Sequence, residues 1–144
     1  MLKNIDPLLT PDLLRALAAM GHGDVIAICD ANFPAYSVAD DKPLIHVPSA
    51  DVVQMLQAIL TLLPVDTFDD EPISTMQVVG DPGAEAEIHK AAREQVFAKL
   101  DPVPAVKGIE RFAYYEAARK AVAVVLTGEQ RPYGNFLVRK GVIF

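Results

Sequence analysis

The stretch AVAVVLTG at residues 121–128 is an apolar run without a charged side chain, and a second such run, DVIAICD at residues 24–30, is bounded by two aspartates. Their short length and their content of valine and isoleucine favour buried strands over helices. Strands that are apolar on both faces are typical of parallel sheets covered by helices. We expect both runs to lie in the interior of such a sheet.

Helical patterns alternate with these runs. Residues 10–21 begin with a threonine that can cap a helix, continue with a proline at the first helical position, and end at Gly21, which favours a left-handed stop. Ser49 is expected to cap a second helix that runs to about Leu63. Residues 84–100 carry apolar side chains every four positions, which predicts a third helix, and a short helix is expected through residues 115–120.

Shorter segments complete the pattern. Brief strands are predicted at residues 44–47, 73–80, 105–111 and 136–143, and residues 31–48 form a proline-rich, irregular connection. Strands that alternate with helices imply an α/β fold. The sequence therefore predicts one three-layer domain over residues 1–144, with a largely parallel sheet flanked by helices.

Composition narrows the class of protein. The chain has 144 residues, is 51% hydrophobic and carries a net charge of −6, which disfavours a nucleic-acid partner. The longest uncharged run, Val52–Val65, has 14 residues and is too short to cross a membrane. A mean hydropathy of +0.23 without a membrane span indicates apolar surface buried between subunits. With a single cysteine and no export signal, a cytoplasmic location is expected.

Several common chemistries are disfavoured. No glycine-rich loop lies between a strand and a following helix, so no nucleotide cofactor is expected. The three histidines, His22, His46 and His89, are too widely spaced for a local metal motif, and no metal is expected. Cys29 lies inside an apolar strand, where a thiol is usually inert. General acid/base chemistry without a cofactor remains.

Two residues at the ends of the strand at residues 24–30 are candidates for that chemistry. His22 lies between two glycines, where a ligand can approach closely, and imidazole can give or accept a proton near neutral pH. A turn histidine near a helix end is the alternative. Asp30 follows the strand, where open α/β sheets bind ligands. A turn-capping aspartate is the alternative.

Two polar clusters lie later in the chain. Arg111 and Tyr115 lie at a strand-to-helix junction, and residues 131–135 form a polar turn that contains an aromatic side chain. Either could be an ordinary solvated loop. Together with Asp30 they supply hydrogen-bonding groups without a large cationic cluster, which suits a neutral polyhydroxylated ligand such as a sugar better than a phosphate.

Five short motifs follow one another along nearly the whole chain: MGHGD at 20–24, DANFP at 30–34, RFAYYEAA at 111–118, TGE at 127–129 and YGN at 133–135. In this order they resemble the L-fucose mutarotase and D-ribose pyranase family. The Gly-His-Gly-Asp form and the Arg-Phe-x-x-Tyr-Glu segment resemble the fucose branch of that family more than the ribose branch.

The resemblance implies an enzyme that interconverts the α and β anomers of a free reducing monosaccharide without cofactor or metal. It also implies a ring-shaped decamer with sites between neighbouring subunits. By motif, His22 corresponds to the proton donor and Asp30 to a sugar-hydroxyl ligand. By motif, the further substrate-binding positions are Arg111, Tyr133, Gly134 and Asn135. Two additional candidates are Tyr115 and Asn32.

Some alternatives stay open. Fucose-type members commonly carry histidines where this chain has Asn32 and Tyr36, so the sugar preference is not fixed by the motifs. Pyranose-to-furanose interconversion of ribose and noncatalytic sugar binding are the rival functions. A regular strand of about 3.3 Å per residue would place His22 and Asp30 roughly 20 Å or more apart. Either that strand is short or bent, which we favour, or the site draws the two residues from different subunits.

Overall fold

Six strands form one mixed sheet in the computed structural model, which describes residues Met1–Phe144. The strands are β1 (Val25–Cys29), β2 (Leu44–Val47), β3 (Ile73–Met76), β4 (Val106–Ile109), β5 (Ala123–Thr127) and β6 (Phe136–Arg139). Their order across the sheet is β2-β5-β1-β6-β3-β4, so the two strongest apolar runs, β1 and β5, lie side by side in its interior.

Five of the six strands share one direction. The β1–β5, β2–β5 and β3–β4 pairs are parallel, whereas β6 runs antiparallel between β1 and β3. The predicted largely parallel sheet is confirmed. Three of the brief strands are shorter than predicted: β3 ends at Met76, before a tight bridge between Val78 and Asp81, β4 ends at Ile109 rather than at residue 111, and β6 ends at Arg139.

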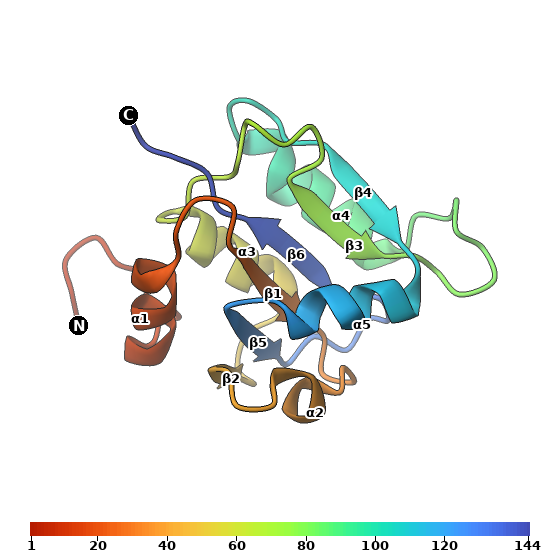
Figure 1. The fold of residues 1–144 in the computed structure, drawn as a ribbon, viewed down its shortest axis with the longest axis horizontal. Coiled ribbons are helices and arrows are strands. Elements are labelled where there is room, and N and C mark those ends of the chain that lie inside the picture. Colours follow the sequence, from red (N-terminus) through yellow and green to blue (C-terminus); the bar gives the residue numbers. More distant parts are fainter.

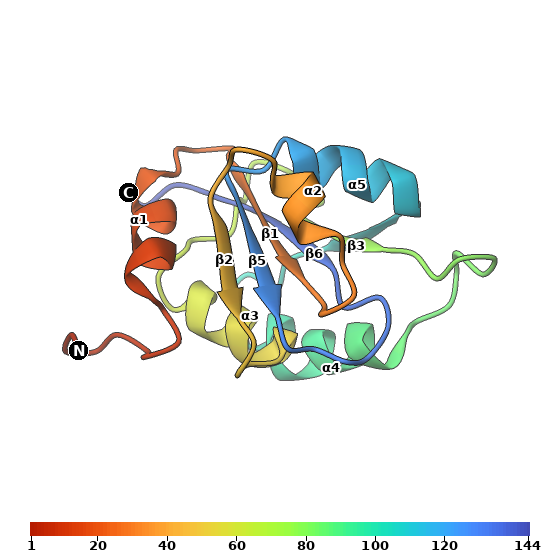
Figure 2. The ribbon, with the colours of Figure 1, turned by 90° about the horizontal axis from the view of Figure 1, so that it is seen from below.

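Helices cover both faces of the sheet (Figures 1 and 2). On one side lie α2 and α5, and on the other α3 and α4; α1 lies at one end of the molecule and shares its core with α3 and α4 (Figure 2). This is the predicted three-layer α/β arrangement. The helices are α1 (Pro11–Ala19), α2 (Ala35–Ala39), α3 (Val52–Leu60), α4 (Glu87–Gln95) and α5 (Arg111–Arg119), with a 3-10 turn at Phe97–Lys99.

The apolar runs supply two cores at once. Along β1, Ile26 and Ile28 join the larger core with α1, α3 and α4, while Ala27 and Cys29 join the smaller core with α2 and α5. Successive side chains of a strand point to opposite faces, so a strand between two helical layers must be apolar at every position. This explains why the run lacks the alternation of a half-exposed strand.

Several helix ends differ from the prediction: α3 ends at Leu60 rather than at about Leu63, and α4 begins at Glu87 rather than at residue 84. The cap of α3 is Asp51 rather than Ser49: its Oδ1 accepts from the Gln54 N–H at 2.8 Å, and Gln54 Oε1 accepts from the Asp51 N–H at 2.9 Å. The left-handed glycine after α1 is Gly23, with φ +85°, rather than Gly21. Helix α5 begins four residues earlier than expected because the Glu110 side chain caps it.

Two further differences concern whole segments. The connection at residues 31–48 contains the short helix α2, which was not predicted because prolines in this segment indicated irregular structure. The helix predicted through residue 100 ends at Gln95 and continues as the 3-10 turn. No helix combines the length and the apolar content needed to cross a bilayer.

Candidate active site

A pocket of about 200 Å³ opens beyond the carboxyl end of β1. Drug-sized ligand sites are typically about 300–1,000 Å³, so this pocket suits a smaller ligand. Its lining contains six of the eight residues that the sequence singled out: Asp30, Asn32, Arg111, Tyr115, Tyr133 and Asn135.

The floor of the pocket is a reciprocal contact between Asp30 and Asn135. The Asp30 N–H donates to Asn135 Oδ1 at 3.1 Å, and Asn135 Nδ2 donates to Asp30 Oδ2 at 3.0 Å. The same Oδ2 accepts from the Gly134 N–H at 3.1 Å, while Oδ1 accepts only from the Asn32 N–H at 3.0 Å. Burial raises the pKa of Asp30, and these N–H donors oppose the rise. Oδ1 keeps acceptor capacity for a ligand hydroxyl.

Close packing explains the glycine at position 134. A Cβ there would lie 3.0 Å from Glu129 Cγ and 3.3 Å from Asp30 Cβ. We expect Gly134→Ala to lower the free energy of unfolding by about 1–3 kcal/mol, as overpacking does. Urea unfolding measures this loss, with Gly83→Ala as the control because a Cβ at Gly83 meets nothing within 4 Å. Equal stability of the two variants would contradict the packing argument.

Arg111 lies at the first position of α5, on the rim of the pocket. Its Nε donates to Tyr115 Oη at 3.1 Å, and its guanidinium lies 5.6 Å from the centre of the Tyr115 ring. Tyr115 packs edge-on against the buried Phe33, with ring centres 5.5 Å apart. The terminal nitrogens of Arg111 have no protein carboxylate to bind, so they can donate to a ligand.

Tyr133 forms the opposite wall. Its backbone is left-handed, with φ +67°, a conformation that non-glycine residues rarely adopt. Its hydroxyl accepts from the Val79 N–H at 3.2 Å. The hydroxyl hydrogen has no protein acceptor, so Tyr133 can donate a hydrogen bond into the pocket.

His22 lies elsewhere, in a cavity at the amino end of β1. Its Nε2 is 3.2 Å from Oδ1 of Asp66, a buried carboxylate that the sequence analysis missed. The His22 ring is half-exposed and packs against Phe68, with ring centres 5.4 Å apart. No local pattern links His22 to an aspartate 44 residues away.

Asp66 is ionised and determines which nitrogen of His22 carries the proton. Burial would raise the pKa of Asp66, but the Phe68 N–H and His22 lower it. The carboxylate therefore stabilises the fold at neutral pH, and this contribution is lost as the pH falls through the lowered pKa. A carboxylate only accepts hydrogen bonds, so it places a proton on Nε2 of His22. This leaves Nδ1 as the nitrogen that can exchange a proton with a ligand.

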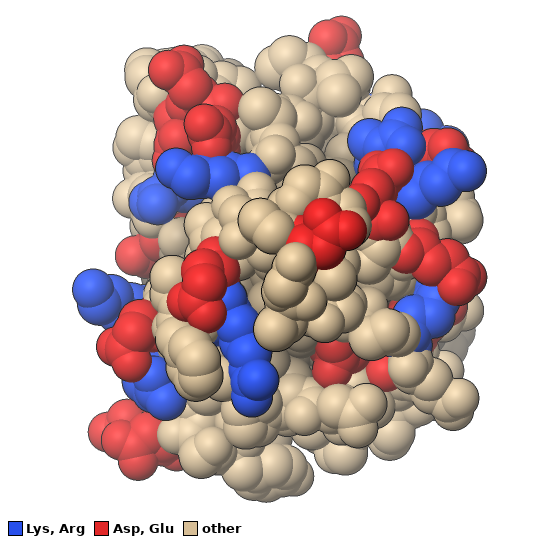
Figure 3. All heavy atoms as spheres, turned by 90° about the vertical axis from the view of Figure 1, so that its right-hand side faces the viewer, with Lys and Arg blue, Asp and Glu red and all other residues tan.

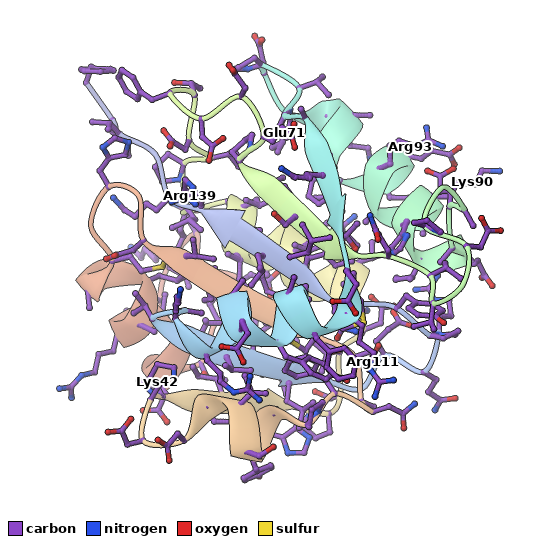
Figure 4. The ribbon with its side chains drawn as sticks, turned by 45° about the vertical axis from the view of Figure 1, so that its right-hand side comes forward. Lys42, Glu71, Lys90, Arg93, Arg111 and Arg139 are labelled. Carbon is purple, nitrogen blue, oxygen red and sulfur yellow. The ribbon has the colours of Figure 1, made fainter.

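The two groups of residues lie at opposite ends of the sheet. The cavity of His22 is lined by Arg139 and the pocket of Asp30 by Arg111. Figure 4 shows these two arginines on opposite sides of the molecule. Strand β1 is regular, in register with β5 and β6 over its length. The expectation that a short or bent strand brings His22 and Asp30 into one pocket of a single chain is therefore wrong.

Glu129 is a second residue whose part in the site the sequence analysis missed. Its buried carboxylate binds Arg131 through Nε and Nη2, both at 2.8 Å, and also accepts from the Val52 N–H at 3.4 Å. Burial opposes ionisation, but Arg131 lowers the pKa of Glu129. Glu129 thus ties the turn that carries Tyr133 to the start of α3. No cluster of three or more His, Cys, Asp or Glu side chains is arranged to hold a metal ion.

The chain is similar to known proteins over nearly its whole length. Residues 3–143 match the family model of the RbsD / FucU transport protein family. The chain belongs to the RbsD / FucU family. Human fucose mutarotase is 42% identical to this family member over 146 residues, covering 99% of this chain and 94% of the human one.

Two solved structures have folds similar to that of this chain over nearly its whole length. The fucose mutarotase of Streptococcus pneumoniae in complex with L-fucose has a TM-score of 0.88 and 36% identity, covering 99% of this chain and 100% of that chain. RbsD of Bacillus subtilis complexed with D-ribose has a TM-score of 0.69 and 26% identity, covering 100% of both chains. The chain is thus more similar to the fucose-bound relative than to the ribose-bound one.

Proposed function

We propose that this protein is a mutarotase that interconverts the α and β anomers of L-fucose or a related free monosaccharide, by general acid/base ring opening without a cofactor. The observation that carries the proposal is the pocket formed by Asp30, Arg111, Tyr133 and Asn135, in a chain that matches a fucose mutarotase over 99% of its length. These side chains offer a carboxylate, a guanidinium, a phenol and an amide, which together bind hydroxyl groups.

The reaction needs one proton to leave the anomeric hydroxyl and one to reach the ring oxygen. The bond between the anomeric carbon and the ring oxygen then breaks, the aldehyde rotates, and the ring closes on its other face. Both oxygens are bonded to the same carbon, so one imidazole nitrogen can serve both. Nδ1 of His22 takes the hydroxyl proton and returns it to the ring oxygen, while Asp66 stabilises the imidazolium in between.

The pocket residues hold the sugar during this exchange. Asp30 Oδ1 accepts from a sugar hydroxyl, and the Tyr133 hydroxyl and the Arg111 guanidinium donate to others. Asn135 and Gly134 act by orienting the Asp30 carboxylate. Tyr115 fixes the Arg111 side chain, and Asn32 extends the rim of the pocket.

We propose that the site is completed between two subunits, with His22 and Asp66 of one chain facing the Asp30 pocket of the next. A head-to-tail contact of this kind forms a ring when the rotation from one subunit to the next closes, and we propose that it closes here. Exposed apolar side chains lie at both ends of the molecule. Phe68 lines the His22 cavity, and Ile143 and Phe144 belong to the chain end marked C in Figure 1. Val79 lines the Asp30 pocket, and Phe112 follows Arg111 at the start of α5. Figure 3 shows residues other than Lys, Arg, Asp and Glu between the charged groups on one end of the molecule.

Light scattering tests the assembly. We expect a mass many times that of one 15.6 kDa chain, with a decamer as the proposed size. A monomer at micromolar concentration would contradict both the ring and the shared site. The lone, buried and free Cys29 supports a cytoplasmic location, which we also propose.

Exchange spectroscopy on free sugars tests the reaction. Saturation transfer between the anomers of L-fucose should increase on addition of the protein, and more than the exchange of D-ribose forms. Faster exchange for ribose alone would favour the pyranase alternative. Sugar binding without faster exchange of any sugar would favour a noncatalytic binding protein.

A further inference from the structure

A third cavity, of about 250 Å³, lies on the other face of the sheet from the Asp30 pocket. Along β3, Thr75 lines this cavity and its neighbour Met76 lines the Asp30 pocket, because successive strand residues point to opposite faces. His89 of α4 also lines the third cavity. The proposed mechanism assigns His89 no role.

Both ring nitrogens of His89 are engaged. Nε2 lies 3.0 Å from the carbonyl oxygen of Tyr133, and Nδ1 lies 3.4 Å from the backbone nitrogen of Ala86. The carbonyl can only accept and the Ala86 N–H can only donate, so the ring must be neutral with its proton on Nε2. The ring also packs edge-on against Phe136, with centres 6.0 Å apart. Its orientation is fixed on three sides.

The Tyr133 carbonyl that His89 bonds belongs to the hydrogen-bond network of the Asp30 pocket, where the sugar is proposed to bind. It also accepts from the Asn135 N–H at 2.8 Å. The side chain of Asn135 in turn donates to Asp30. The residue that carries this carbonyl, Tyr133, has the uncommon left-handed backbone, which persists only where neighbouring groups fix it.

We propose that His89 is a positioning residue for the sugar pocket, whose Nε2–H holds the Tyr133 carbonyl and thereby keeps the Tyr133 hydroxyl and the Asn135 amide aligned with Asp30. His89 touches neither the sugar nor the reacting atoms. Its expected effect on catalysis rests on the proposed mutarotase function, whereas its effect on the geometry of the turn does not.

The surroundings of His89 favour the neutral ring. Burial lowers the pKa of His89, although the Tyr133 carbonyl and the Glu85 carboxylate act in the opposite direction. Glu85 and Arg93 are the charged groups that share its cavity, and they are paired with each other at 2.7 Å. A lowered pKa means that the neutral, correctly bonded ring predominates at neutral pH. Its stabilising contribution is lost as the pH falls through that pKa, when Nδ1–H would face the Ala86 N–H.

Two substitutions separate the hydrogen bond from the packing. His89→Phe keeps a ring of similar volume but cannot donate, whereas His89→Gln places an amide N–H near the position of Nε2. We expect His89→Phe to raise the KM for L-fucose about 10-fold, the equivalent of one hydrogen bond, with a smaller change in kcat. His89→Gln should stay within about 3-fold of the wild type. His46→Phe, at an exposed position of β2, is the control.

Nuclear magnetic resonance gives a readout that does not depend on activity. Long-range ¹H–¹⁵N spectra of the wild type should show His89 as the Nε2–H tautomer, and the Gly134 and Asn135 amide signals should shift in His89→Phe but not in His46→Phe. The Nδ1–H tautomer in the wild type would overturn the proposal even if His89→Phe fails to fold. A folded His89→Phe protein with wild-type Gly134 and Asn135 amide signals and a wild-type KM for L-fucose would also overturn the proposal. A wild type without mutarotase activity refutes the proposed function and leaves the tautomer and amide tests of His89 intact.

Discussion

Replacement of His22 by alanine is expected to slow catalysed anomer exchange by about 10²- to 10⁴-fold, the usual contribution of a general acid/base group. The fold should survive because the His22 side chain is 49% exposed and lies in a turn. Asp66 would keep its hydrogen bond from the Phe68 N–H at 3.1 Å, so its buried carboxylate would not be left without a donor.

The measurement is saturation-transfer spectroscopy on L-fucose, with circular dichroism and light scattering on the same samples. His46→Ala is the matched control, because His46 is an exposed histidine on β2 that lines neither the His22 cavity nor the Asp30 pocket. Wild-type exchange rates in His22→Ala would refute the proton-transfer role. An unfolded His22→Ala would instead identify His22 as a structural turn residue.

The second large effect is expected from mixing two defective variants. Asp30→Asn should lose about 10- to 100-fold in activity, because its amide must turn a donor toward Asn32 on one side or toward Gly134 and Asn135 on the other. If a site takes His22 from one chain and Asp30 from the next, an equal mixture of His22→Ala and Asp30→Asn chains contains sites in which both residues are native.

Random assembly of such a mixture should restore about one quarter of wild-type activity, since half of the chains carry each native residue and neighbours assort independently. The two chains are unfolded together in urea, refolded as a mixture, and assayed against each variant refolded alone. If the mixture has only the mean activity of the two variants, each site lies within one chain or does not use both residues. His22→Ala refolded with wild type controls for losses in refolding.

The sequence by itself determined the layers of the fold. The runs at residues 24–30 and 121–128 are apolar at every position because each serves two cores, and this pattern identifies them without coordinates. Helix ends were less predictable: Ser49 and Asp51 are both good caps, and only the neighbouring Gln54 decides between them. The ordered motifs also indicated the family, which the comparisons confirm.

The tertiary structure alone decided which residues meet. Asp30 and Asn135 are 105 residues apart, and His22 and Asp66 are 44 apart. Periodicity reports which face of a helix or strand is buried, whereas such contacts depend on strand order and direction. The placement of β6 antiparallel to β1 is what brings Asn135, just before β6, against Asp30, just after β1. Strand β1 also keeps His22, which precedes it, at the opposite end from Asp30. An extended backbone rises by a fixed distance per residue and cannot fold back on itself.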